Sequence, residues 1–332
     1  MRRQHQQTRP QQCNQHPPSN GTGTSNGRPP AIVETLEHRR FAEFCDACKR
    51  YRYIGLCYGS PGVGKTLSAR HYANWEKVQA YWNHQCQTKP LLKEISKGTV
   101  AFYTSPVVAS QGHLERDIGK SRGLLHDATI ERARRYEYAR MIRLLNRAEK
   151  LRDPRHNPDG YRSAQADKAE NAFFEQRNRS MRVRTSVPDP TALLVIDEAD
   201  RLKVSGLEQV RHIFDRGGIG LVLIGMPGIE KRLARYPQFY SRIGFVHEFR
   251  PLDAPAIRQL LDRGWAPPGV QLPPFPLDPE TVAAIIRITG GNFRLLNRLL
   301  TQMERILEIN ALREVSKAVV EAARESLVIG EA

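Results

Sequence analysis

The 332-residue sequence contains no uninterrupted run of 18 apolar residues, the length that a membrane-spanning helix requires. It also lacks the short apolar core of a secretory signal peptide. We therefore expect a soluble, cytoplasmic protein with no membrane partner. Its five cysteines are odd in number and irregularly spaced, so we expect reduced thiols. Cys45 and Cys48 form a C-x-x-C pair, but a zinc site would need a second such pair.

Acidic residues are scarce relative to basic ones. The chain has 35 Asp and Glu against 51 Lys and Arg, a formal net charge of +16. This imbalance favours a polyanionic partner, although it says nothing about the fold. Large apolar side chains are almost missing from residues 1–31, which are rich in Gln, Asn, Pro, Gly and Arg. We expect this segment to be a disordered basic and polar tail.

A complete phosphate-loop motif, G-x-x-x-x-G-K-[ST], dominates what the sequence does contain. It follows an apolar run at 53–58 and precedes a helical pattern at 66–80, the context that the motif requires. Its glycines let backbone N–H groups turn toward a triphosphate. We expect Lys65 to reach the β- and γ-phosphates of ATP and Thr66 to ligate Mg²⁺. The predicted nucleotide-binding residues are Gly59, Ser60, Pro61, Gly62, Val63, Gly64, Lys65 and Thr66.

A second motif follows the apolar run that begins at Thr191. It ends in two adjacent carboxylates, Asp197 and Glu198, the pattern of a Walker B strand. We expect Asp197 to hold Mg²⁺ and Glu198 to orient and polarise the attacking water. Alone, such a pair could cap a helix, but downstream of a phosphate loop it predicts ATP hydrolysis.

The order of elements predicts an α/β fold with a parallel sheet flanked by helices. Apolar runs indicate strands near 53–58, 99–104, 191–197, 219–224 and 245–249, with helices near 32–51 and 204–216. Beyond Pro251 the pattern is helical, near 254–264, 279–289, 291–311 and 314–327. We therefore expect a P-loop core at 32–251, with an insertion at about 113–187, and a small helical lid at 252–332.

Two arginines complete a resemblance to the AAA+ ATPases. Arg242 precedes the last predicted strand, and Arg294 begins a lid helix. The resemblance implies that Arg242 is a finger reaching the γ-phosphate of a neighbouring subunit, and that Arg294 couples the lid to the nucleotide. The chain departs from the family at Ile224–Gly228, where a polar residue usually ends the strand after Walker B. Hydrolysis is therefore expected to be slow, or its water oriented by Glu198 alone.

More narrowly, the chain resembles the AAA+ regulators encoded by bacterial transposons, the TnsC/TniB/MuB/IstB group. The resemblance implies an ATP-dependent homo-oligomer, a ring or a filament, that binds double-stranded DNA and recruits a transposase. Replication initiators, helicase loaders and secretion ATPases share several of the same blocks, so remodelling of a protein partner is the alternative. The blocks are the phosphate loop, Leu193–Leu202, Gly206–Arg211, Leu221–Gly228, Gln238–Arg242 and Thr289–Arg294.

The insertion at 113–187 is basic, with 18 Lys and Arg against 11 Asp and Glu, a net charge of +7. Its middle, 130–152, predicts a basic helix, and 177–184 contains four arginines and no acid. Arginines of this kind suit contacts with DNA phosphates. A solvated helical excursion or a protein-docking surface explains the pattern equally well, and the sequence leaves these alternatives open.

Overall fold

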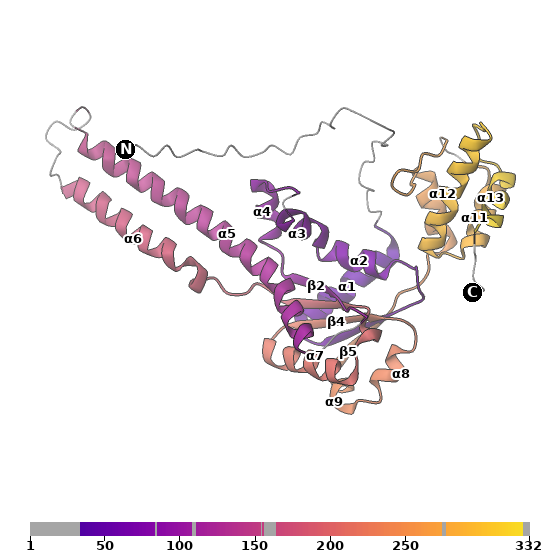
Figure 1. The fold of residues 1–332 in the computed structure, drawn as a ribbon, viewed down its shortest axis with the longest axis horizontal. Coiled ribbons are helices and arrows are strands. Elements are labelled where there is room, and N and C mark those ends of the chain that lie inside the picture. The colour runs from indigo at the N-terminus through magenta and orange to yellow at the C-terminus, as the bar shows by residue number, and fades with distance from the viewer. Residues whose placement is uncertain are drawn as a thin grey trace. The chain divides into compact units, whose positions relative to one another are not determined.

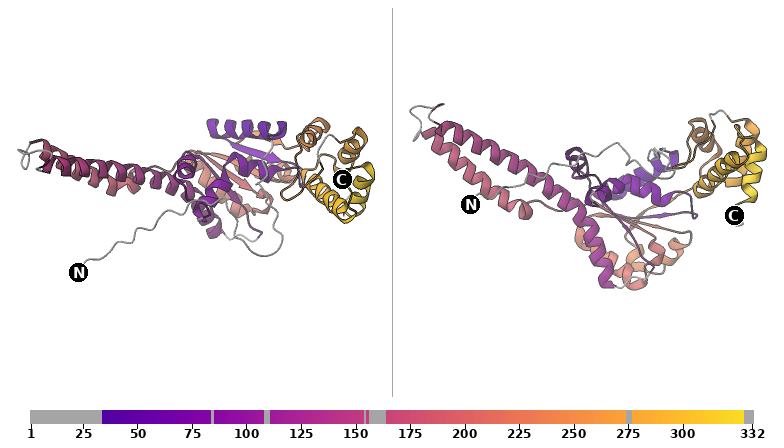
Figure 2. Two further views of the ribbon diagram at one scale, coloured as in Figure 1. Left: turned by 90° about the horizontal axis from the view of Figure 1, so that it is seen from above. Right: turned by 45° about the horizontal axis from the view of Figure 1, so that its top comes forward.

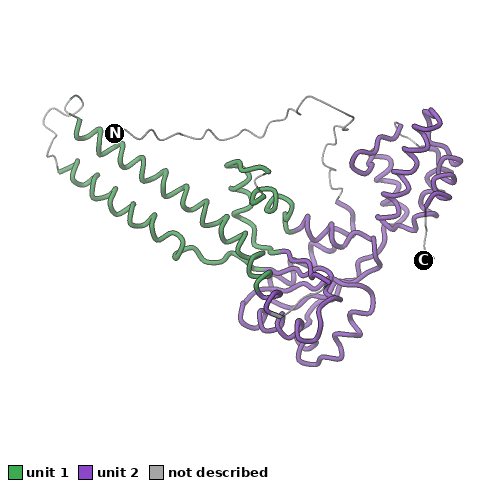
Figure 3. The backbone as a smooth tube through the Cα atoms, in the orientation of Figure 1, with its two compact units in different colours: residues 1–17, 73–101, 116–192 green, residues 18–72, 102–115, 193–332 purple. Residues whose placement is uncertain are grey.

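The computed structural model describes residues 34–83, 85–107, 111–153, 155, 164–273 and 277–327. The tail predicted to be disordered at 1–31 lies outside these residues. The chain forms two compact units (Figure 3). One contains 73–101 and 116–192. The other contains, of the described residues, 34–72, those within 102–115, and those from Leu193 onward.

A five-stranded sheet has the order β2-β3-β4-β1-β5 (Figure 1). Its β1–β4, β1–β5 and β3–β4 pairs are parallel, so these strands place their carboxyl ends at one edge. Side chains of β3 and β4 are buried throughout, which explains why these strands are continuous apolar runs in the sequence. The strands are β1 (Ile54–Tyr58), β2 (Val100–Thr104), β3 (Leu193–Asp197), β4 (Gly220–Gly225) and β5 (Ile243–Glu248).

Helices cover the sheet on both faces (Figure 2). Helix α1 begins after Thr35, whose hydroxyl caps it by accepting the His38 N–H. Cys45 and Cys48 are free thiols buried on the inner face of α1, and burial raises the pKa of Cys48 to about 12. The predicted fold class is confirmed. The helices are α1 (Leu36–Tyr51), α2 (Lys65–Tyr72), α7 (Val204–Gly217), α8 (Ile229–Leu233) and α9 (Pro237–Tyr240), with a 3₁₀ turn, η2, at Ala199–Arg201.

One helix prediction was wrong. The pattern at 66–80 indicated a single helix, whereas the structure has α2 ending at Tyr72 and α3 (Trp75–Trp82) beginning three residues later. Asn74 separates them with a left-handed backbone, φ 50°. Asparagine adopts this conformation more readily than most residues, so it ends one helix without interrupting the apolar spacing.

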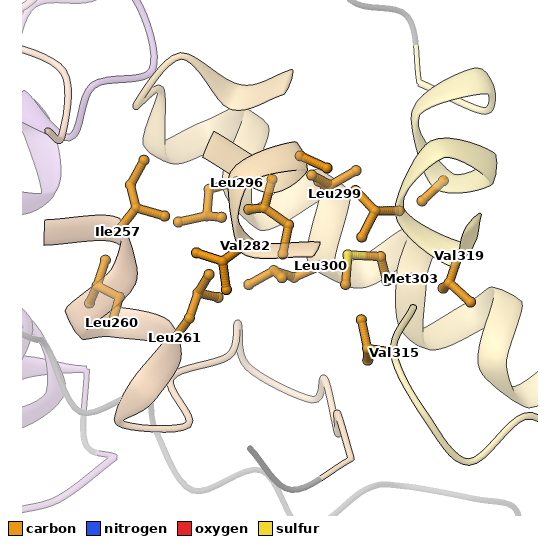
Figure 4. Close-up of a cluster of buried hydrophobic side chains, with 14 of the residues drawn as sticks. Ile257, Leu260, Leu261, Val282, Leu296, Leu299, Leu300, Met303, Val315 and Val319 are labelled. Atoms are coloured by element: carbon orange, nitrogen blue, oxygen red, sulfur yellow. The ribbon is translucent and has the colours of Figure 1, made fainter. Parts of the chain in front are cut away.

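The C-terminal helices form a bundle with its own core (Figure 4). Leu260, Leu261, Leu296, Leu299 and Leu300 are at most 2% exposed. Side chains of Asp253, Asp278, Asn292 and Ser316 cap the four N-termini. The helices are α10 (Ala254–Asp262), α11 (Pro279–Thr289), α12 (Phe293–Ile309) and α13 (Lys317–Glu325).

The remaining compact unit is helical. It contains α3, α4 (Lys89–Ile95), most of α5 (Gln111–Arg152), and α6 (Ala164–Ser186). Helices α5 and α6 run side by side in opposite directions (Figures 1 and 2). They fill most of the insertion predicted at 113–187. No helix within the described ranges is both long enough and apolar enough to cross a membrane.

Candidate functional site

The phosphate loop connects the carboxyl end of β1 to the first turn of α2, which begins at Lys65. Gly62 and Gly64 have φ of +83° and +108°, values that side chains rarely adopt. A Cβ at Gly59 would lie 2.2 Å from the Phe249 carbonyl oxygen, so only glycine lets these backbones approach. Near Gly64 a Cβ would meet nothing within 4 Å, because this glycine faces open space. The loop therefore has the backbone conformation that requires glycine at Gly62 and Gly64, with open space beside it.

Lys65 is 8% exposed, and its ammonium is held by its own loop. Its Nζ donates to the carbonyl oxygens of Gly59, at 2.6 Å, and Ser60, at 2.9 Å. Burial lowers the pKa of Lys65, while the carboxylates of Asp197 and Asp200 oppose this shift. An ammonium has three donors, so one remains for an anion in the cavity that Lys65 lines.

Thr66 and the end of β3 meet across the same space. The Thr66 hydroxyl donates to Asp197 Oδ2 at 2.7 Å, and the other carboxylate oxygen accepts the Glu198 N–H at 2.9 Å. Burial raises the pKa of Asp197, which is 3% exposed. A hydroxyl and a carboxylate side by side are ligands that Mg²⁺ prefers. This pair therefore fits the predicted metal site.

Glu198 has a left-handed backbone, φ 55°, which is uncommon for a residue other than glycine. The Glu198 side chain is 41% exposed, lines the cavity, and lies 3.6 Å from the Arg201 guanidinium. It is thus a solvent-accessible carboxylate in the same cavity as Thr66 and Asp197, and its role in orienting water stays a prediction.

Asp200 supplies a polar group that sequence reasoning missed. The strand β4 ends without a polar side chain, as noted for Ile224–Gly228. In the structure, Asp200 Oδ2 accepts the Met226 N–H at 2.8 Å, and Asp200 lines the cavity. Burial raises the pKa of its carboxyl group. The carboxylate therefore ties the end of β4 to the turn after β3, close to where the polar residue was expected.

The lid reaches the phosphate loop through the start of α12. The Arg294 N–H donates to the Gly62 carbonyl at 2.9 Å, and Asn292 Nδ2 donates to the Pro61 carbonyl at 2.8 Å. Asn292 Oδ1 also accepts the N–H groups of Arg294 and Leu295, which caps the helix. The same amide thus holds the loop and starts the lid helix.

A cavity of about 370 Å³ brings most of the predicted residues together. Gly59, Ser60 and Val63 lie outside its lining: the first two hold Lys65, and Val63 lines a neighbouring pocket. The predicted residues that line the cavity are Pro61, Gly62, Gly64, Lys65, Thr66, Asp197, Glu198 and Arg294.

An apolar pocket of about 220 Å³ adjoins this cavity, and the two share Gly64, Leu67, Phe293 and Asn297. The rings of Trp265 and Phe293 lie 5.1 Å apart between their centroids. A flat apolar base attached to phosphates in the cavity would fit such a pocket. This pocket could not be predicted from the sequence, because its lining residues come from distant segments. Its other lining residues are Thr35, His38, Val63, Ser68, Phe249, Leu252, Leu260, Trp265 and Pro268.

Arg242 lies apart from the described residues that line the cavity. It directly precedes β5, as predicted. Its Nε donates to Asp215 Oδ1 at 2.7 Å and its Nη2 to Oδ2 at 3.1 Å, a bidentate pair. Arg211 donates to the same carboxylate at 3.0 Å. The Arg242 side chain is 32% exposed and lines neither of the two cavities described above.

Comparisons with known proteins place the chain in a family. A sequence model of the AAA domain matches residues 48–233, more than half of the chain. A Staphylococcus aureus protein named "Potential ATP-binding protein" is 39% identical over 307 residues, covering 90% of this chain and 97% of that protein.

Solved structures with a similar outline share less sequence. The RuvB Holliday junction branch migration motor of Thermotoga maritima is 15% identical, with a TM-score of 0.49 over 90% of this chain and 71% of that chain. The Aeropyrum pernix ORC1 protein, solved in complex with DNA, is 19% identical, with a TM-score of 0.44 over 87% and 64%. From the sequence model and the S. aureus relative, we conclude that this chain belongs to the AAA domain family.

Proposed function

We propose that this protein is an ATPase that binds Mg²⁺–ATP, assembles on double-stranded DNA and marks that DNA for a transposase. The observation that carries the ATPase part is the convergence of Lys65, Thr66, Asp197 and Glu198 on one cavity. These four side chains come from two segments about 130 residues apart in the sequence, yet Thr66 and Asp197 are in direct contact.

Each side chain has a role that follows from its position. Lys65 and the loop N–H groups would bind the phosphates, while Thr66 and Asp197 would hold Mg²⁺. The bound metal supplies charge neutralisation on the phosphates. Glu198 would orient a water molecule and accept its proton, because its carboxylate is exposed to the cavity.

Hydrolysis would need a second subunit. Arg242 is 32% exposed and does not line its own chain's nucleotide cavity, which supports a role for its guanidinium at the nucleotide of a neighbour. An arginine supplied in trans stabilises the charge that develops on the transferred phosphoryl group. This arrangement supports a homo-oligomer in which turnover depends on assembly.

The DNA part rests on charge. A net charge of +16 favours a polyanion, and no base-reading motif such as a zinc finger is present in the sequence. Binding should therefore be nearly independent of DNA sequence. The transposase partner rests on the sequence blocks shared with the transposon regulators. The alternative, a AAA+ ATPase that remodels a protein, would show stimulation by an unfolded protein instead of by DNA.

A gel-shift titration of duplex DNA with ATP, with ADP and without nucleotide tests the proposal. We expect tight binding only with ATP, similar affinities for unrelated sequences, and a steep loss of affinity with salt, about 0.9 in log–log slope per phosphate neutralised. The Lys65→Ala protein should bind poorly although it keeps nearly all its positive charge. Failure of the wild-type protein to bind duplex DNA in ATP would refute the DNA part, as would tight binding to one sequence.

A further inference from the structure

Helices α5 and α6 form an antiparallel hairpin (Figures 1 and 2). Three contacts fix its register: Arg152 with Glu170, Glu137 with Gln176, and the His126 ring with the Val187 carbonyl at 2.7 Å. As residue numbers fall along α5, those of the partners rise along α6. The hairpin is therefore a defined helical pair within its compact unit.

The apolar sides of both helices face this seam. On α5, Met141, Leu144, Ala148 and Leu151 recur at spacings of three and four, and Ala148 is 7% exposed. On α6, Ala166, Ala169, Gln176 and Val183 share a heptad pattern, and each is at most 8% exposed. Each helix thus covers part of the apolar side of the other, while Phe174 and Met181 of α6 stay exposed.

One outer face of α5 is a row of arginines. Arg140, Arg143 and Arg147 are exposed and follow the exposed Tyr136 at spacings of four, seven and eleven residues. At 100° per residue these positions share one face, about a quarter-turn from the seam. We call Tyr136, Arg140, Arg143 and Arg147 the arginine stripe. No acidic residue occurs between Glu137 and Glu149.

Unlike several other arginines of the hairpin, those of the stripe have no carboxylate partner among the described residues. Arg122 pairs with Asp189, Arg135 with Glu131, and Arg152 with Glu170. Among the described residues, Arg140, Arg143 and Arg147 form no ion pair, and the Arg143 side chain donates only to the Ala139 carbonyl. Their charge is therefore available to an external anion.

We propose that the arginine stripe binds the phosphate backbone of duplex DNA, and this rests on the proposed function. Guanidinium groups match phosphate oxygens bidentately, and a row of them along a rigid helix suits a polymer with evenly repeated charges. Exposed Arg177, Arg179, Arg182 and Arg184 on α6 add to the positive field. A membrane surface fits less well, because an interfacial helix needs a continuous apolar face. On α6 only two large apolar side chains, Phe174 and Met181, are exposed, and they stand among arginines.

The test replaces all three stripe arginines by glutamine, R140Q/R143Q/R147Q. A matched control, R258Q/R305Q/R313Q, removes the same charge from exposed arginines of the C-terminal bundle and the loop after α12. Binding of one duplex in ATP is measured from 50 to 300 mM salt. If each stripe arginine neutralises one phosphate, the log–log salt slope falls by about 2.7 in the stripe variant. In the control variant the slope should change much less, because its lost charges act on the DNA only at long range.

Further measurements separate the possible failures. The lysine variant R140K/R143K/R147K, which keeps the charge, should retain most of the slope, and ATPase activity without DNA should be the same in all proteins. Equal slopes in the stripe variant and the control would overturn the inference but leave the proposed function standing. No duplex binding by the wild-type protein would refute the proposed function itself. Retained duplex binding with lost binding to anionic vesicles would assign the stripe to a membrane and overturn its assignment to DNA.

Discussion

Substituting alanine for two glycines of the phosphate loop should have separable effects. Gly62 and Gly64 both have positive φ, +83° and +108°. Alanine in such a conformation costs about 1–2 kcal/mol wherever it occurs. This backbone cost is common to Gly62→Ala and Gly64→Ala, so a comparison of the two variants isolates what each new methyl group meets.

The methyl groups meet very different surroundings. At Gly62 the new carbon would lie 2.5 Å from Asn292 Oδ1 and 2.9 Å from Arg294 Cβ, whereas at Gly64 nothing lies within 4 Å. Moving Asn292 would break its bond to the Pro61 carbonyl and its cap on α12, each worth about 1 kcal/mol. We therefore expect Gly62→Ala to weaken the attachment of the lid by about 2 kcal/mol more than Gly64→Ala.

Hydrogen exchange without nucleotide measures this attachment directly, because the Arg294 N–H donates to the Gly62 carbonyl. A difference of 2 kcal/mol corresponds to roughly 30-fold faster exchange at that amide in Gly62→Ala. In Gly64→Ala the lid amides should stay near wild-type protection, while ATP binding falls because the methyl group occupies the space beside the loop. Equal loss of protection at Arg294 in both variants would show that backbone strain, and not the lid contact, controls the loop.

Three further outcomes are expected. Lys65→Ala should abolish ATP binding, whereas Glu198→Gln should bind ATP and turn it over at least about 100-fold more slowly; equal binding loss in equilibrium dialysis would contradict these roles. Arg242→Ala should bind ATP without hydrolysing it. Mixing it with Lys65→Ala should restore some phosphate release, because the intact site of the first variant then meets the intact Arg242 of the second. No recovery at any mixing ratio would argue against action in trans. Burial and the neighbouring His71 lower the pKa of His38 below 6.5. As the pH falls, the His38 side chain is therefore protonated in the unfolded chain before it is protonated in the folded one. The free energy of unfolding should then decline below pH 6.5, by at most about 1.4 kcal/mol per pH unit. Urea titrations at pH 7.5 and 5.5 should show a smaller decline in His38→Phe, and an unchanged one would rule this residue out.

The fold was largely predictable because its central strands are buried on both sides. A buried parallel strand is a continuous apolar run, and β1, β3 and β4 are such runs bounded by glycine or carboxylates. The phosphate loop was predictable for a different reason. Its residues are contiguous, so the motif alone indicates the local backbone conformation. The break between α2 and α3 at Asn74 was not predictable, because the apolar spacing continues through it and only the backbone conformation changes.

Parts of the site that depend on distant contacts left no sequence signal. In the sequence, Asp200 is one more acidic residue in an acidic run. Only its hydrogen bond from the Met226 N–H shows that it holds the end of β4. Trp265 and Phe293 are ordinary apolar residues in the sequence, and only the fold brings their rings into contact. The pairing of Arg242 with Asp215 also joins the start of β5 to α7, so neither residue indicates the other in the sequence.

The Asp215 carboxylate changes what assembly could contribute to Arg242. In a single chain this guanidinium already has a counter-ion. Meeting a neighbour's nucleotide would thus exchange one anion for another, and the net gain is the difference between two ion pairs. The pair that is lost is partly exposed and worth about 1 kcal/mol or less. Asp215 therefore reduces what Arg242 adds to the affinity between subunits by about 1 kcal/mol at most, which is less than a tenfold change in the association constant.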